Sequence, residues 1–220
     1  MAKKIFISPS NQNGNKYAYG NTTEDVECGK IGKALETALK RCGFETKLEQ
    51  YYKISKRVAD ADAWGADLYV PIHSNAFNNS VAGTRMFYGA DDGKKACECI
   101  FKYLAPLTPG TSENIKKADY DEITDPKAIT AYIEVDFHDV SSVAKWIIEH
   151  PSEIAETICH GICDYFNVKY IAPAAPVETQ KEPAKLYRVQ VGAYAVRSNA
   201  DLMLKRLKDN GFDGFIVESK

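Results

Sequence analysis

The sequence has few of the features that mark several large classes of protein. No apolar run approaches the roughly 20 residues that a helix needs to cross a bilayer, so we expect no membrane insertion. The opening "MAKKIFISPS" lacks the apolar core of about 7–15 residues that a secretory signal requires. We therefore expect synthesis in the cytoplasm without a signal peptide. The formal net charge of −2 argues against nucleic acid as the main partner.

Residues that commonly bind metals are also sparse. The chain has four histidines, six cysteines and no Cys-x-x-Cys pair. We predict free thiols, as in a reducing compartment, at these positions: Cys28, Cys42, Cys97, Cys99, Cys159 and Cys163. Cys159 and Cys163 lie four residues apart on an expected helix and so share a face. A zinc site at that pair is the less favoured alternative.

What remains is an ordinary globular balance, with 45% hydrophobic and 26% charged residues. Apolar runs alternate with helical patterns, which predicts an α/β fold with a mostly parallel sheet flanked by helices. Pro71 is expected to end its strand because proline cannot donate to a sheet ladder. The expected strands are "KKIFIS", "FETKLEQYY", "DLYVPI", "GTRMFYG" and "AITAYIEVDF", and the expected helices are 24–42, 54–65, 91–104, "SSVAKWII" and "PSEIAETICHGICDYF".

A change in composition divides the chain. Residues 171–185, "IAPAAPVETQKEPAK", are rich in proline and poor in bulky apolar side chains, as in a semi-extended linker. Residues 186–220 then show a strand, an amphipathic helix and a second strand. We therefore predict a catalytic domain over 1–170 and a small C-terminal β-α-β unit over 186–220. Such a unit is too small to bury a core by itself.

The C-terminal segment differs from the rest in charge. From Ala184 onward the chain carries seven Lys or Arg residues and four acidic residues, which leaves +3 there and −5 elsewhere. A basic module favours an anionic polymer as a partner. An ordinary solvated helix face explains the charge equally well.

Chemistry is expected at the carboxyl ends of the strands, where open α/β sheets bind their ligands. The loop from Ser8, His73 and Glu134 all fall at such ends, and Glu24 begins the first helix. Taken singly, His73 is more often a structural residue, and Glu24 favours the helix dipole. Glu134 stands inside an apolar strand, where a carboxylate is costly unless it is paired or functional. Taken together, these residues offer metal ligands and a base for a zinc hydrolase.

Residues 4–166 carry a pattern that is more specific than any single residue. Its most specific piece is the "R…A…AD…IHSNA…GT" run, which includes Arg57, Ala66, Asp67, His73, Asn75 and Gly83. "KIFISPSNQ" precedes this run and "AITAYIEVDFHD" follows it. This order resembles the zinc-dependent N-acetylmuramoyl-L-alanine amidases of the cell-wall type, which include phage endolysins. The resemblance covers about three quarters of the chain.

The resemblance implies specific roles at the site. The family binds Zn²⁺ through His, Glu and His, and it uses a catalytic Glu late in the domain. By position, Glu24 and His73 would be zinc ligands and Glu134 the catalytic base.

The family's first histidine, from a Gly-His-Gly-Gly motif, is absent here, since Asn11 occupies its place in "SPSNQNG". One alternative is that Asn11 or Gln12 coordinates weakly or through water, because an amide oxygen is a poorer zinc ligand than imidazole. The favoured alternative is that His138, four residues after Glu134, supplies the imidazole. The third is a metal-poor, inactive site. Asn75 is a further possible neighbour of metal or substrate.

The C-terminal residues "YRVQVGAY…LKRLKDNGFDGFIVE" resemble one repeat of the sporulation-related (SPOR) peptidoglycan-binding fold, which normally pairs two such repeats. One repeat implies either docking on the catalytic domain or a homodimer in which each chain lends a repeat; the dimer is preferred. The two resemblances together imply a phage-type lysin. It would cleave the amide between N-acetylmuramic acid and L-alanine after its release to the cell wall. The alternatives are an inactive wall-binding protein and a zinc peptidase acting on the stem peptide.

Overall fold

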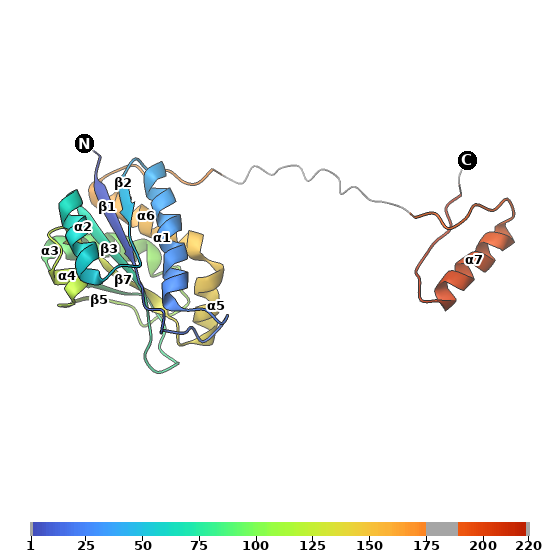
Figure 1. Ribbon diagram of the computed structural model, residues 1–220, viewed down its shortest axis with the longest axis horizontal. Coiled ribbons are helices and arrows are strands. Elements are labelled where there is room, and N and C mark those ends of the chain that lie inside the picture. Colours follow the sequence, from blue (N-terminus) through green and yellow to red (C-terminus); the bar gives the residue numbers. More distant parts are fainter. Residues whose placement is uncertain (1, 175–188, 219–220) are drawn as a thin grey trace. The chain divides into compact units, whose positions relative to one another are not determined.

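The computed structural model describes residues 2–174 and 189–218 (Figure 1). The chain divides into two compact units, Met1–Pro173 and Ala174–Lys220, which are described separately. None of the helices among the described residues is both long and apolar enough to span a bilayer.

The first unit is built on a seven-stranded sheet with the strand order β2-β1-β3-β7-β4-β5, in which β6 also pairs with β3. The pairs β1–β2, β1–β3, β3–β6, β3–β7 and β4–β5 are parallel, whereas β4 runs antiparallel to β7. The mostly parallel sheet predicted from sequence is therefore confirmed. The strands are β1 (Lys4–Pro9), β2 (Glu45–Leu48), β3 (Leu68–Asn75), β4 (Arg85–Tyr88), β5 (Asn114–Lys117), β6 (Ile129–Thr130) and β7 (Tyr132–Phe137).

Helices cover both faces of this sheet (Figure 1). They are α1 (Glu24–Arg41), α2 (Ile54–Trp64), α3 (Asp91–Leu104), α4 (Asp121–Thr124), α5 (Ser141–Glu149) and α6 (Pro151–Phe166). Alternate side chains of β1 and β3 supply two cores. Ile5 and Val70 pack in the larger core with α1, α3, α5 and α6, while Phe6 and Tyr69 pack with α2 in the smaller one. Both faces of the central strands are buried, as their unbroken apolar runs predict.

Strand β3 corrects one expectation from the sequence. Pro71 does not end the strand, because β3 continues to Asn75 and Pro71 pairs in register with Ser8. A proline removes only one ladder donor. The neighbouring residues Val70 and Ile72 are fully buried, and we attribute the tolerance of Pro71 to that burial. The continuation of β3 beyond Pro71 carries His73 to the carboxyl edge of the sheet.

The segment between α3 and β7 contains two elements that the sequence patterns did not predict. These are the four-residue strand β5 and the four-residue helix α4. Both are short and polar, so neither shows a hydrophobic period. Asp136 fixes the neighbouring loops, because its carboxylate accepts hydrogen bonds from the backbone N–H groups of Gly83 (2.6 Å) and Gly110 (3.4 Å).

In the second unit the predicted helix is present as α7 (Arg197–Asp209). Arg197 pairs with Asp201 and with Glu218, both at 3.1 Å. Among the described residues of this unit, 189–196 and 212–218 form no strand. Most of the predicted linker 171–185, and residues 186–188 of the first predicted strand, lie outside the described residues.

Candidate active site

The candidate site lies at the carboxyl edge of the sheet, on the face covered by α2 and α4. His73 of β3 and Glu134 of β7 are register partners in adjacent parallel strands, so their side chains point to the same face. Glu24 is the first residue of α1, which follows the loop after β1. The fold thus brings together three of the residues that the sequence singled out.

His73 lies between two carboxylates. Its Nδ1 is 3.0 Å from Glu24 Oε1, and its Nε2 is 3.1 Å from Glu122 Oε2. The ring of Tyr132 stacks on the imidazole with a centroid separation of 4.8 Å. Burial opposes the charged imidazolium, but the hydrogen bonds to Glu122 and Glu24 prevail and raise the pKa of His73 to about 10. Without a metal, a proton therefore occupies the space between Nδ1 and Glu24.

Glu122 was not predicted from the sequence, and it holds His73 from the side opposite Glu24. Its Oε1 accepts hydrogen bonds from Ser8 Oγ at 2.8 Å and from the Tyr69 hydroxyl at 3.0 Å. Burial raises the pKa of Glu122, but His73 and Arg57 more than offset it and leave the pKa below its ordinary value. Glu122 is therefore an ionised acceptor that directs the Nε2–H of His73 and leaves Nδ1 facing Glu24.

Arg57 lies beneath Glu122 and is fully buried. Its Nη1 donates to the carbonyl of Pro9 at 2.7 Å, and its Nη2 is 3.7 Å from Glu122 Oε1. Within the described part of the chain, Nε and Nη2 have no hydrogen-bond partner. Glu122 is thus the carboxylate that compensates this buried charge.

Glu134 has a buried carboxylate oxygen without a hydrogen-bond partner among the described residues, which is unusual for a residue with a purely structural role. Its Oε2 is buried and has no hydrogen-bond partner among residues 2–174 and 189–218. Burial raises the pKa of Glu134 to about 7, and Glu24 adds to this rise, while the positive charge of His73 opposes it. The residue as a whole is partly exposed, although Oε2 itself is buried. A carboxylate with a pKa near neutrality can both accept and return a proton.

The loop after β1 places its amides differently. Gln12 Nε2 lies 3.4 Å from His73 Nδ1, and Asn15 Nδ2 donates to Glu24 Oε2 at 2.6 Å. Asn11, which stands where the family has a histidine, instead donates to the carbonyl of Tyr52 at 3.2 Å. Asn75 ends β3 and bonds the N–H of Ala76 at 2.8 Å. Gln12 is therefore the residue of this group that reaches His73.

His138 lies at the end of β7 and is buried. Its Nδ1 is 2.8 Å from the carbonyl of Ser74, and its ring stacks on Tyr17 with a centroid separation of 4.9 Å. Burial lowers the pKa of His138, so the ring is neutral near pH 7. Donation from Nδ1 leaves Nε2 as its basic nitrogen. His138 does not share the hydrogen bonds that join His73 to Glu24.

These residues fit a cation that prefers nitrogen and oxygen ligands. A metal between Nδ1 of His73 and Oε1 of Glu24 would replace the proton there and neutralise charge next to the unpartnered oxygen of Glu134. A complete three-ligand set is not preformed. Across the described residues, only three cysteines form a group of His, Cys, Asp or Glu ligand atoms that all lie within 4.8 Å of one another.

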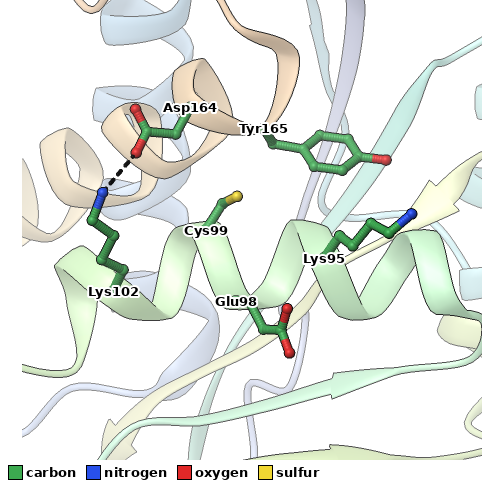
Figure 2. A pocket seen from close by; sticks show the side chains of 6 residues that line it. All are labelled: Lys95, Glu98, Cys99, Lys102, Asp164 and Tyr165. Carbon is green, nitrogen blue, oxygen red and sulfur yellow. Dashed lines mark hydrogen bonds and ion pairs between the residues drawn. The ribbon is translucent and has the colours of Figure 1, made fainter.

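A shallow pocket on the other face of the sheet is a separate feature (Figure 2). It lies between α3 and α6, where Lys102 pairs with Asp164 at 3.1 Å. Glu98 and Lys95 of α3 also line it. It contains no pair of carboxylates around a histidine, and we assign no chemistry to it.

Two known families match different parts of the chain. Residues 5–164 match the family described as N-acetylmuramoyl-L-alanine amidase, and residues 168–218 match the SPOR domain. The sporulation-specific N-acetylmuramoyl-L-alanine amidase of Bacillus subtilis (strain 168) is 24% identical over 226 residues, which cover 97% of this chain and 84% of the relative.

Two solved structures share the fold of the first unit. The catalytic domain of CwlV, an N-acetylmuramoyl-L-alanine amidase from Bacillus (Paenibacillus) polymyxa var. colistinus, superposes with a TM-score of 0.71 at 21% identity, covering 76% of this chain and 99% of CwlV. The catalytic domain of the CD27L endolysin, which targets Clostridia difficile, gives a TM-score of 0.64 at 17% identity, covering 74% of this chain and 97% of that structure.

Proposed function

Because the chain belongs to the N-acetylmuramoyl-L-alanine amidase family, we propose that it hydrolyses the amide between N-acetylmuramic acid and the first L-alanine of the peptidoglycan stem peptide. The observation that carries this proposal is the position of His73 Nδ1, 3.0 Å from Glu24 Oε1, in the same cluster as Glu134 with its unpartnered oxygen. Family membership supplies the substrate class. The geometry supports Glu24, His73 and Glu134 as the residues that perform the reaction.

Glu24 and His73 would hold the zinc ion. When bound, zinc supplies a Lewis acid that makes water nucleophilic near neutral pH and polarises the amide carbonyl. Glu134 accepts the proton of the attacking water on its carboxylate and returns it to the nitrogen of the departing alanine. A pKa of about 7 suits both transfers.

We propose His138, through Nε2, as the third protein ligand of the zinc ion, with Gln12 as the alternative. The bond from His138 Nδ1 to the Ser74 carbonyl supports His138, because metal-binding histidines commonly donate their other N–H to such an acceptor. Gln12 is supported by its distance of 3.4 Å to His73 Nδ1. Zinc affinities of His138→Gln and Gln12→Ala decide between them. The variant that lacks the true ligand should lose at least about tenfold in affinity, and the other should stay near wild type.

The reaction is tested on purified peptidoglycan. The proposal expects new N-terminal alanine, with one free lactyl carboxylate left on the glycan for each. New amino groups on another stem residue would instead support a zinc peptidase. Binding to the wall without any new amino group would support an inactive wall-binding protein.

The C-terminal unit is proposed to bind peptidoglycan and keep the catalytic unit near its substrate. Its match to the SPOR domain supports this role. We further propose that two chains pair through this unit, since 189–196 and 212–218 form no strand in the single chain. Pelleting with insoluble peptidoglycan tests the binding, and a chain that sediments as a monomer at micromolar concentration would contradict the pairing.

The biological setting is also a proposal. The resemblance to endolysins suggests a phage-type lysin that reaches the wall after release from the cytoplasm. The matched relative from Bacillus subtilis is instead named sporulation-specific. Lysis of growing cells after addition of the protein from outside would support the lysin, whereas activity confined to spore peptidoglycan would contradict it.

A further inference from the structure

Three cysteines gather in the catalytic unit, away from Glu24 and His73. Cys42 caps the C-terminal end of α1, and Cys159 and Cys163 lie one turn apart on α6. All three side chains are buried, and their Sγ atoms lie within 4.8 Å of one another. The packing of α1 against α6 therefore adds a third thiol to the pair that shares a helix face.

We propose that Cys42, Cys159 and Cys163 form a second metal site, which binds Zn²⁺ through three sulfur atoms. The Sγ atoms of Cys42 and Cys159 are 3.7 Å apart. This matches the edge of about 3.8 Å of a tetrahedron whose Zn–S distances are about 2.3 Å. It is far longer than the roughly 2.05 Å of a disulfide bond. Soft thiolate donors select zinc over magnesium or calcium.

One contact of Cys42 favours negative charge on its sulfur, whereas burial raises the pKa of this thiol. The backbone N–H of Ile171 donates to Cys42 Sγ at 3.3 Å, and such donation stabilises negative charge on sulfur. The carbonyl oxygen of Ile171 lies 3.7 Å from the same sulfur. That oxygen or a water molecule would complete the fourth position. The Nε of Arg41 holds the Ile171 carbonyl in place at 2.8 Å.

The location makes this site structural. It would join the C-terminal end of α1, the middle of α6 and the segment by which the chain leaves the catalytic unit. Since the three cysteines are buried, the site has no open face for substrate, unlike the site around Glu134. Cys97 is a useful contrast in the same core, because its thiol donates to the Phe87 carbonyl at 3.4 Å and belongs to no such group within the described residues.

The experiment measures metal content and the spectrum of the Co²⁺-substituted full chain, purified under reducing conditions. We expect about two zinc equivalents per chain in the wild type and about one in Cys159→Ser. Co²⁺ in the wild type should show a sulfur-to-metal charge-transfer band that Cys159→Ser lacks. Cys97→Ser is the matched control and should keep both the band and the metal content.

Two further variants keep the proposal falsifiable. If Cys159→Ser does not fold, Cys42→Ser carries the same test from the end of α1. His73→Ala should retain the charge-transfer band, which separates this site from the proposed active site. Three results would overturn the site. They are a wild type without the charge-transfer band, a band unchanged in both cysteine variants, and a disulfide between any two of these cysteines in protein purified under reducing conditions.

Discussion

Helix α1 carries polar groups of opposite kinds at its two ends. Glu24 begins the helix among carboxylates, amides and imidazole, while Cys42 caps its other end among thiols. The 18 residues of α1 separate the two clusters by about 27 Å. One rigid helix therefore holds hard oxygen and nitrogen donors at one end and soft sulfur donors at the other.

The two clusters differ in their exposure to solvent and in whether their polar atoms have hydrogen-bond partners. The cluster at Glu24 lies at the edge of the sheet, contains partly exposed side chains, and includes a buried oxygen of Glu134 without a partner. The thiols at Cys42 are buried, and they hydrogen-bond to one another and to Ile171. An accessible, unsatisfied cluster suits catalysis, whereas an enclosed and satisfied one suits a structural role.

Removal of the proposed base should abolish the catalytic role of the accessible cluster, and we expect this to be the largest effect of any variant. Glu134→Gln keeps the shape of the side chain but cannot accept a proton, so release of N-terminal alanine should fall by about 10²–10⁴-fold. Zinc content and folding should stay near wild type, since Gln carries no buried charge. Glu98→Gln, which changes an exposed carboxylate of α3, is the matched control. Activity within a few-fold of wild type in Glu134→Gln would exclude Glu134 as the base.

The next largest effect is expected at Glu122. Glu122→Gln weakens the acceptor for His73 Nε2–H, so zinc affinity and kcat/KM should fall by about 10–100-fold. Asp121→Asn, one residue earlier in α4 and exposed, should change neither quantity. A loss of thermal stability with unchanged zinc affinity would make Glu122 a core residue only.

The free energy of unfolding of the metal-free protein should depend on pH through the ionisation of His73. Because hydrogen bonds raise the pKa of His73 to about 10, its imidazolium stabilises the metal-free fold fully below pH ~6.5, and this stabilisation is lost as the pH rises toward 10. We expect the difference in free energy of unfolding between wild type and His73→Gln, without metal, to shrink over that range. Denaturant titrations at several pH values measure it. A difference that does not change with pH would mean that the ring is neutral in the fold.

The smallest effect is expected at Asn11. Its side chain bonds to the Tyr52 carbonyl and not to His73, so Asn11→His should change zinc affinity by less than about threefold. Isothermal titration with Zn²⁺ checks this, with Asn13→His as the control in the same loop. A tenfold gain would show that position 11 can reach the metal after all.

The sequence predicted the fold well where elements were long and periodic. The run around Ile31 and Leu35 predicts α1, and the apolar stretch at Val70 predicts a central strand, because burial imposes these patterns. The expectation that the strand ends at Pro71 was wrong. The loss of one ladder hydrogen bond at a proline is local, whereas the burial of its neighbours is a property of the whole sheet. Strand β5 and helix α4 gave no signal, since four residues with a single isoleucine cannot show a hydrophobic period.

The candidate site was predictable only in part, for a related reason. Glu24 begins a recognisable helix, and His73 and Glu134 are register partners in recognisable strands, so topology alone places them together. Glu122 occurs in the acidic stretch "DYDEITD", where nothing distinguishes it from its neighbours. The third thiol of the cysteine group was hidden likewise, since Cys42 and Cys159 are 117 residues apart and meet only through helix packing.

The burial of Arg57 beneath Glu122 has a consequence for how this protein can change over generations. Loss of Glu122 alone leaves the charge of Arg57 uncompensated in the interior, a cost of about 3–5 kcal/mol, which is a large share of a typical domain's stability. Loss of Arg57 alone leaves His73 as the remaining positive partner of Glu122. Exchange of both for apolar residues is far cheaper, although it sacrifices the acceptor that directs His73. We therefore expect lineages that abandon catalysis to lose the two residues as a pair. An Arg57→Met, Glu122→Leu double variant that is more stable than either single variant would reproduce that route.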